Sequence, residues 1–360
     1  MKYVDEFRSA DRVRETVRAL DALTTRPWTI MEVCGGQTYA IVKFGLQELL
    51  PKKIRLIHGP GCPVCVTPAH IIDHALSIAE SGAILCSFGD MLRVPGSSSS
   101  LLSAKAKGAS VHIVHSPLDA LEIARENPSR QVVFLAIGFE TTAPANAVSV
   151  FQAKKEGIEN FSMLCSHVLV PPALEFLVHS PDNEVQAFLA PGHVCTITGE
   201  SEYRLLCERH SLPIAITGFE PLDILQGIYF CVQMLERGCP DVVNQYSRSV
   251  CLEGNQVALS MLDDVFEVRD ALWRGIGTIE ASGLFLRREY AEFNAEERFP
   301  FTSKCSCKEQ GCISGEILQG RKRPSECPMF NRQCTPEQPL GAPMVSNEGA
   351  CAAYYHYCIR

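Results

Sequence analysis

The chain has 360 residues, of which 46% are hydrophobic and 21% charged, and its net charge at pH 7 is -8. This composition is ordinary for a globular protein of two or three domains. The acidic balance gives no electrostatic footprint for nucleic acid or an anionic lipid surface, and no apolar run approaches the length of a membrane span. We therefore expect a protein that uses neither nucleic acid nor membrane as a partner.

Residues 1–30 predict an amphipathic helix, which we expect to pack on the C-terminal domain. Its apolar side chains recur with helical spacing on one face: Val4, Phe7, Val13, Val17 and Leu20. Charged residues are spread through this segment from Lys2 and Asp5 onward, so it lacks the continuous apolar stretch of a secretory signal. This pattern places the protein in the cytoplasm.

Residues 27–240 alternate short apolar runs with helical patterns, which predicts an α/β fold of parallel sheets with helices on both faces. The eight predicted strands are Thr29–Val33, Ile54–His58, Ala83–Phe88, Ser110–His115, Val132–Gly138, Phe161–Ser166, Ala187–Ala190 and Pro213–Gly218. They suit one large sheet or two smaller ones.

Short internal sequence similarities favour two sheets over one. Ala136–Glu140 reads AIGFE and Ile216–Glu220 reads ITGFE, while Gly59–Val64 and Ala190–Val194 share the letters PG before a loop. We expect two similar α/β domains, 31–145 and 146–240, that face each other across a cleft. Loops at the carboxyl ends of the strands would line that cleft, where open α/β sheets bind their ligands.

Residues 241–360 predict a helical segment followed by an irregular iron–sulfur domain. Leu252–Arg287 looks mainly helical. Beyond about residue 300, cysteine, proline and glycine become dense and periodicity disappears. A segment with no packed core of its own needs another source of stability. In the cytoplasm, we expect this to be a bound metal rather than a disulfide.

Seventeen cysteines are many for a reducing compartment, where they indicate metal ligation or thiol chemistry. Six lie in apolar patterns and are expected to be buried packing residues: Cys86, Cys165, Cys207, Cys231, Cys239 and Cys251. Seven lie in the C-terminal segment: Cys305, Cys307, Cys312, Cys327, Cys334, Cys351 and Cys358. Four thiolates there favour a [4Fe-4S] cluster over structural zinc, because the paired CxxC knuckles of a zinc ribbon are missing. Zinc stays open as the alternative.

Cys62 and Cys65 form a CxxC motif after the strand that ends at His58. We expect Thr67 to cap a helix that begins at Pro68. Because a helix N-terminus favours thiolate, the motif predicts a redox dithiol. Half of a metal knuckle, or two inert thiols, are the alternatives.

Other candidate residues also follow strands. Cys34 precedes Gly35-Gly36, where a partner can approach the backbone closely, so it is a candidate nucleophile or metal ligand. For Cys34, the alternative is a small residue that fills a tight turn.

Glu140 and Thr142 follow a second predicted strand, and His193 follows a third. His193 is a candidate base, metal ligand or structural hydrogen-bond donor. No P-loop, GxGxxG, HExxH or GxSxG motif supports nucleotide hydrolysis or serine catalysis.

Together and in this order, the motifs resemble the HypD family of [NiFe]-hydrogenase maturation factors. The matching stretches are MEVCGGQT (Met31–Thr38), HGPGCPVC (His58–Cys65), GFETTAP (Gly138–Pro144), PGHV (Pro191–Val194) and the block Cys305–Tyr355. The resemblance implies two α/β domains plus an iron–sulfur domain. It also implies a scaffold that assembles the Fe(CN)2CO unit of the hydrogenase with a small HypC-type chaperone and a HypE-type cyanide carrier.

The same resemblance implies roles for individual residues. Cys34 would hold the iron, as an exposed cysteine of low pKa at a cleft, and Cys62 and Cys65 would be a redox pair. The implied ligands of the [4Fe-4S] cluster are Cys307, Cys327, Cys334 and Cys351, whereas Cys305, Cys312 and Cys358 should tolerate serine. The competing function is an iron–sulfur thiol–disulfide reductase acting on a partner protein, which would keep the CxxC motif and the cluster but not need Cys34.

Overall fold

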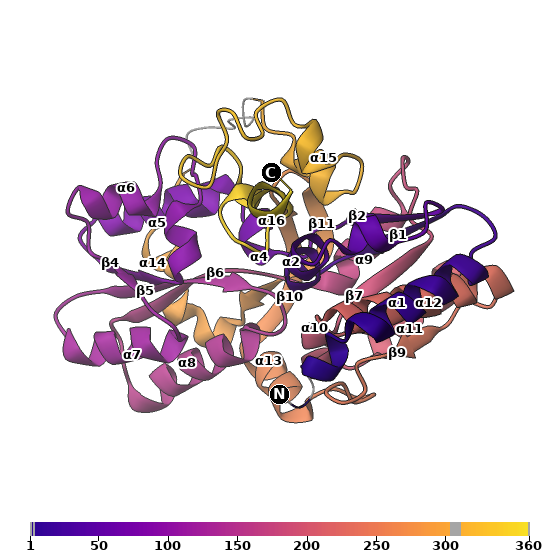
Figure 1. The fold of residues 1–360 in the computed structure, drawn as a ribbon. Coiled ribbons are helices and arrows are strands. Elements are labelled where there is room, and N and C mark those ends of the chain that lie inside the picture. Colours follow the sequence, from indigo (N-terminus) through magenta and orange to yellow (C-terminus); the bar gives the residue numbers. More distant parts are fainter. Residues whose placement is uncertain (1, 3, 303–310, 359–360) are drawn as a thin grey trace.

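The computed structural model describes residues 2, 4–302 and 311–358, which form two β-sheets with helices on both faces (Figure 1). The α/β class predicted from the sequence is confirmed, and all eight predicted strands are present. Within the described ranges, no helix has both the length and the apolar character needed to span a membrane.

The first sheet is entirely parallel and has the strand order β2-β1-β7-β8-β9. Its strands are β1 (Trp28–Glu32), β2 (Ile54–His58), β7 (Ala187–Pro191), β8 (Ile214–Thr217) and β9 (Val242–Asn244). The chain adds β2 on one side of β1, whereas β7, β8 and β9 follow one another on the other side. The strand order therefore reverses between β1 and β7, and such a reversal opens a crevice at the carboxyl ends of the two strands.

The second sheet is mixed and has the order β10-β11-β6-β5-β3-β4. Its strands are β3 (Ile84–Ser87), β4 (Val111–Ile113), β5 (Val132–Gly138), β6 (Phe161–Val168), β10 (Phe266–Trp273) and β11 (Gly277–Leu286). Side chains of β5 alternate between two cores, with Phe134 on one face and Leu135 on the other. Because both faces are covered, this strand reads as a continuous apolar run.

Each sheet lies between two layers of helices. On the first sheet, α1 (Ala10–Leu23), α2 (Gly35–Lys43) and α12 (Pro221–Arg237) cover one face, and α9 (Val170–Val178), α10 (Gly192–Thr198) and α11 (Ser201–His210) cover the other. On the second sheet, the layers are α7 (Pro117–Glu126), α8 (Ala143–Glu156) and α13 (Gln256–Val265) opposite α5 (Ala69–Glu80), α6 (Leu101–Ala106) and α14 (Ala295–Arg298). The remaining helices are α3 (Leu46–Leu49), α4 (Pro63–Val66), α15 (Ser314–Leu318), α16 (Ala350–Tyr357) and the 3-10 turns Asp5–Phe7, Gly89–Arg93, Arg288–Phe293, Pro324–Glu326 and Ala342–Met344.

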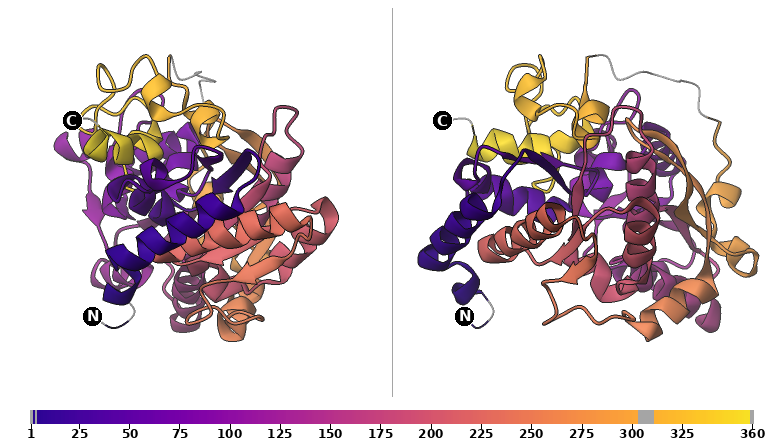
Figure 2. Two further views of the ribbon diagram at one scale, coloured as in Figure 1. Left: turned by 45° about the vertical axis from the view of Figure 1, so that its right-hand side comes forward. Right: turned by 90° about the vertical axis from the view of Figure 1, so that its right-hand side faces the viewer.

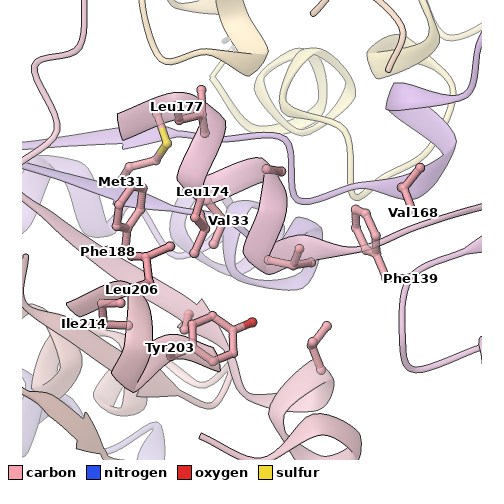
Figure 3. Close-up of a cluster of buried hydrophobic side chains, with 14 of the residues drawn as sticks. Met31, Val33, Phe139, Val168, Leu174, Leu177, Phe188, Tyr203, Leu206 and Ile214 are labelled. Atoms are coloured by element: carbon pink, nitrogen blue, oxygen red, sulfur yellow. The ribbon is translucent and has the colours of Figure 1, made fainter. Parts of the chain in front are cut away.

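One apolar core joins the two sheets (Figure 3). Met31 and Phe188 reach it from the first sheet, while Phe139 and Val168 reach it from the carboxyl ends of β5 and β6. Leu174 of α9 fills the space between them. The sheets therefore share buried surface and are not separated by an open cleft at this point.

The sheets do not follow the boundary predicted at residue 146. The chain builds β1 and β2, crosses to the second sheet for β3 to β6, returns for β7 to β9, and crosses again for β10 and β11. Each sheet thus contains two separate stretches of the chain. Alternation of strands and helices cannot reveal such crossings, because the local pattern is the same in both sheets.

The N-terminal helix is present and packs mainly on α12 (Figure 2). Leu20 is buried in the core of the first sheet. The carboxylate of Glu236 in α12 accepts hydrogen bonds from the Thr25 backbone N–H at 2.7 Å and from Trp28 Nε1 at 2.8 Å. These contacts fix the helix against the first sheet.

The segment predicted as mainly helical, Leu252–Arg287, is a helix followed by an antiparallel hairpin. After α13, strands β10 and β11 pair with each other, and β11 also pairs with β6. The turn contains Gly275 at φ 75° and Gly277 at φ 121°, a backbone region that suits glycine. The expectation of a mainly helical Leu252–Arg287 is therefore wrong for residues 266–286, since a short apolar run fits a helix or a strand equally well.

The C-terminal segment has a small core of its own, contrary to expectation. Ile317, Cys334, Met344 and Cys351 pack together, and α16 lies against α2 of the first sheet (Figure 1). The last part of the chain is thereby placed beside the loop that follows β1.

Candidate functional site

Four loops meet at the carboxyl edge of the first sheet. Cys34 follows β1, and Cys62 follows β2. His193 is the second residue of α10, which follows β7, and Phe219 follows β8. The parallel arrangement places all four strand ends at one edge. Because α2 and α10 leave toward opposite faces of the sheet, the loops carrying Cys34 and His193 diverge around the crevice.

Cys34 and His193 are brought together in this crevice. The Sγ atom of Cys34 lies 3.5 Å from Nδ1 of His193. Burial lowers the pKa of His193 to about 4, so the imidazole is neutral at physiological pH. The ring of Phe219 lies 5.4 Å from that of His193 and closes one side of the pair.

Cys34 is not the exposed cysteine of low pKa that the sequence predicts. Its side chain is 0% exposed. Burial is the main reason why its pKa lies well above the ordinary value, and the charges of Glu32 and Glu348 raise it further. A neutral thiol is a poor nucleophile and a poor ligand until a cation replaces its proton.

A buried hydrogen-bond network supports the Cys34 loop. Glu32 is 0% exposed, and its Oε2 accepts the Cys34 backbone N–H at 2.9 Å. Its other oxygen accepts the Thr38 hydroxyl and lies 2.6 Å from His58 Nδ1. A carboxylate that receives several donors in an apolar interior holds the adjoining backbone in place.

The network continues into the C-terminal helix. Gln47 Nε2 lies 3.1 Å from His58 Nε2, and the Tyr354 hydroxyl of α16 donates to Gln47 Oε1 at 2.9 Å. The Tyr354 hydroxyl also lies 3.2 Å from His58 Nε2. Sequence reasoning missed Glu32 and His58, although a charged residue at the end of the apolar strand WTIME was an available signal.

Gly35 leaves room for the protein's own C-terminal segment, and Gly36 leaves room for the Phe219 ring. A Cβ on Gly35 would lie 2.5 Å from Cβ of Glu348, and one on Gly36 would lie 3.1 Å from the Phe219 ring. Burial raises the pKa of Glu348. We expected an external partner to use this space, but in the structure Glu348 fills the position beside Gly35.

The two CxxC cysteines form a disulfide, with their Cα atoms 5.3 Å apart. Cys62 caps the short helix α4, and both side chains are buried. The predicted capping is wrong in detail: Thr67 ends α4 and donates its hydroxyl to Pro63 O at 2.9 Å, and Pro68 precedes α5. A Cβ on Gly61 would lie 2.1 Å from the Cys34 nitrogen, so the disulfide loop and the Cys34 loop touch.

Glu140 and Thr142 make their contacts elsewhere. Glu140 Oε1 accepts the Val170 N–H at 2.8 Å, at the start of α9. Its other oxygen is buried without a partner among the described residues, and burial raises its pKa to about 8. Thr142 Oγ1 lies 3.4 Å from His167 Nε2. The sequence grouped both with Cys34 because all three follow strands, but β5 belongs to the other sheet.

One C-terminal thiol, that of Cys351, is influenced by three other cysteines of the described residues. The pKa of Cys351 lies well above its ordinary value because of burial and of the neighbouring Cys312, Cys334 and Cys327. The apolar shell around them contains Ile313, Met329 and Phe330. Cys307, the fourth ligand implied by the resemblance, lies outside the described residues, and Cys312 stands with the other three.

The six cysteines expected to be buried divide into two groups. Cys86, Cys165, Cys207 and Cys231 are buried, as expected, but Cys239 and Cys251 are exposed. Cys239 follows the left-handed Gly238 that ends α12, and turns of this kind lie at the surface.

The chain is similar to known proteins over nearly its whole length. A family model described as "HypD: Hydrogenase formation hypA family" matches residues 9–358. The hydrogenase maturation factor HypD2 of Bradyrhizobium diazoefficiens is 47% identical, over 99% of this chain and 97% of that protein. The hydrogenase maturation factors HypD of Escherichia coli and Azotobacter vinelandii are 46% and 44% identical, over 99% of this chain and 98% and 97% of their own lengths.

Proposed function

Because the chain belongs to the HypD family of hydrogenase maturation factors, we propose that it is the scaffold on which the Fe(CN)2CO unit of [NiFe] hydrogenase is assembled. The observation that carries the proposal is the pairing of Cys34 Sγ with His193 Nδ1, 3.5 Å apart, at the crevice between β1 and β7. Thiolate and imidazole are both ligands that iron accepts. The iron, with its CN and CO ligands, is the cargo of the scaffold.

Iron binding and deprotonation of Cys34 are coupled in this proposal. A thiol must lose its proton to become a ligand, and the positive charge of the iron favours that loss. The neutral His193 ring offers an acceptor 3.5 Å from Sγ. The raised pKa of Cys34 keeps the thiol inactive until iron arrives.

The Cys62–Cys65 pair would supply the electrons that free cyanide from a carrier thiocyanate. One carrier R–S–CN and two thiols give R–SH, HCN and one disulfide, so the carbon–sulfur bond breaks as the sulfur–sulfur bond forms. The disulfide form that the structure holds is the product of this step. Another turnover requires two electrons and two protons from a cellular reductant.

A [4Fe-4S] cluster fits the C-terminal thiols. Four cysteines, Cys312, Cys327, Cys334 and Cys351, interact electrostatically beside an apolar cluster, and four cysteines are the usual ligand set of such a [4Fe-4S] cluster. When bound, the cluster can transfer single electrons. The chain's own residues contribute the ligands and the contact of α16 with α2, which makes residues 311–358 an iron–sulfur domain lying on the Cys34 loop.

The fourth ligand can be decided by paired variants. Cys307→Ser should keep the brown absorbance of the anaerobically purified protein, whereas Cys312→Ser should lose it and destabilise the C-terminal segment. The opposite result would return the role to Cys307. A colourless wild-type protein that contains zinc would instead support the zinc alternative.

The function is tested by anaerobic co-purification with a small HypC-type chaperone, followed by infrared spectroscopy of bound CN and CO. Cys34→Ala should abolish the bands while the cluster absorbance stays. Cys251→Ala, at an exposed cysteine, is the matched control and should keep both signals. Normal CN and CO bands in Cys34→Ala would show that Cys34 is not the ligand of the iron.

The buried disulfide also favours a second function, a thiol–disulfide reductase that uses the cluster to reduce a partner protein. In that case Cys34→Ala would retain full activity toward the partner disulfide, and Cys62→Ser would lose it. Under the scaffold proposal, both Cys34→Ala and Cys62→Ser should lose the ability to support maturation of the hydrogenase. The proposed partners are the HypC-type chaperone and the HypE-type cyanide carrier, and we place the assembly in the cytoplasm.

A further inference from the structure

Three metal-ligating side chains meet at the ends of α9 and α11, outside the Cys34 site. Glu175 and His179 are four positions apart on α9 and its C-cap, so they share one face of the helix. His210 is the last residue of α11. His210 Nε2 lies 2.7 Å and His179 Nδ1 3.8 Å from the same oxygen, Glu175 Oε1.

The spacing of these donors suits one metal ion. One donor atom from each residue lies within 4.8 Å of the others. Around a tetrahedral ion with nitrogen and oxygen bonds of about 2.0–2.2 Å, ligand atoms are about 3.3–3.6 Å apart. Rotation of side chains, without movement of the helices, can therefore bring the three donors to a single ion.

The site is packed on one side and open on the other. The side chain of His210 is 16% exposed, that of Glu175 33%, and that of His179 64%. Glu175 and His179 line a cavity of about 660 Å³, together with Phe176, Glu202 and Arg209. The cavity leaves room for water or another small ligand beside an ion.

Hydrogen bonding within the end of α9, and between Glu175 and the end of α11, is the competing explanation for this cluster. His179 Nδ1 lies 2.8 Å from the backbone oxygen of Glu175, and ligation through Nδ1 would replace this bond. Arg209 Nη1 lies 3.9 Å from Glu175 Oε2 and opposes a cation there. The Arg209 side chain is mostly exposed, however, so it can turn toward water when an ion binds.

We propose that Glu175, His179 and His210 form a site for a first-row divalent cation of the zinc type, with at least one coordination position open to the cavity. Two imidazoles and one carboxylate form a donor set that zinc and its neighbours favour. Magnesium and calcium prefer all-oxygen sites. A bound ion fastens the end of α9 to the end of α11.

The test is a titration of the full-length, cluster-loaded protein with Co²⁺ under anaerobic conditions. The wild type should bind about one equivalent more than His179→Ala, as a species with visible bands but without thiolate-to-metal charge transfer. Affinity for this equivalent should fall at least about tenfold in His179→Ala and Glu175→Gln. His115→Ala, at an exposed histidine of the other sheet, is the matched control and should bind as the wild type does.

Thermal unfolding gives a second readout that does not depend on the spectrum. Zn²⁺ should raise the Tm of the wild type and of His115→Ala, because it binds the folded state, and this rise should be lost in His179→Ala. Equal Co²⁺ binding and equal Tm shifts in all variants would overturn the proposal. So would a spectrum that arises from thiolate ligation alone, since the ion would then sit on cysteines.

Discussion

Cys34 combines complete burial with two neighbouring carboxyl groups, and both features keep its thiol protonated. This state protects the residue from oxidation and alkylation, because the thiolate is the reactive form. Each unit by which the pKa rises lowers the thiolate fraction about tenfold.

We expect iodoacetamide to label Cys34 at least about tenfold more slowly than Cys239 or Cys251 in the folded, iron-free protein. The two reference cysteines are exposed. Mass spectrometry of the labelled peptides gives the three rates, and denaturant should make them equal. Equal rates in the folded protein would show that the Cys34 loop opens readily.

Glu140 should make stability depend on pH. Burial raises its pKa from 4.5 to about 8, so the folded state binds the proton more tightly than the unfolded state. The resulting stabilisation is complete below about pH 4.5 and is lost as the pH rises through about 8. Between these two pH values, each unit by which the pH rises lowers the contribution of Glu140 to the free energy of unfolding by about 1.4 kcal/mol.

Glu140→Gln should remove this contribution, because the amide has the shape of the protonated acid and does not ionise. Relative to the wild type, the variant should gain stability between pH 5 and pH 8, as measured by urea unfolding at both values. Glu156→Gln, at an exposed glutamate of α8, is the control. An unchanged difference between wild type and Glu140→Gln across this range would contradict the burial argument.

At the scale of elements, the sequence predicts buried strands well and their partners poorly. All eight expected strands exist because alternating or continuous apolar runs fix burial locally. The hairpin of β10 and β11 is not predicted because the apolar–charged alternation of Phe266–Arg269 is short and breaks at Asp270, where the strand register shifts. The pairing of Cys34 with His193 was also not predictable, because it depends on β1 lying beside β7.

The network from Glu32 to α16 should stabilise the Cys34 loop. His58→Ala leaves the fully buried Glu32 short of one partner, which should cost about 1–3 kcal/mol in unfolding free energy. Tyr354→Phe removes a single hydroxyl and should cost about 1 kcal/mol. Urea unfolding measures both values, with His115→Ala as an exposed control that should stay within about 0.5 kcal/mol of the wild type.

If the proposed function is correct, the same variants should also weaken the infrared CN and CO bands of the complex with the chaperone, without loss of the cluster absorbance. A stability loss with bands of normal intensity would mean that the network only supports the fold. In that case Glu32 and His58 would have no part in positioning Cys34.

Helix α4 should carry a reversible two-electron couple. After equilibration in thiol buffers and quenching with acid, labelling in denaturant should show Cys62 and Cys65 gaining label together at one midpoint ratio. Denaturant is needed because both side chains are buried. Cys62→Ser should leave Cys65 labelled at every ratio, and the same outcome for the wild type would show that the pair is not a redox couple.

At the scale of the whole molecule, the repeated crossing of the chain should make the two sheets unfold together. Trp28 lies in β1 of the first sheet, whereas Trp273 lies in β10 of the second, within the core that the two sheets share. Trp28→Phe and Trp273→Phe therefore give single-tryptophan proteins. In each single-tryptophan protein, the urea midpoint measured by fluorescence should equal the midpoint that circular dichroism gives for the same protein. Separate midpoints would mean that the sheets are independent units.

The contact of α16 with the Cys34 loop also sets an order of events during protein synthesis. Tyr354 follows His58 by 296 positions, and translation at about 5–20 residues per second separates their appearance by about 15 to 60 s. Throughout that interval, the nascent chain presents Cys34 without the segment that later closes over Gly35. Cys34 is therefore synthesised early and the segment that covers it last, so the nascent chain is the stage at which this thiol is most accessible to metal ions and oxidants.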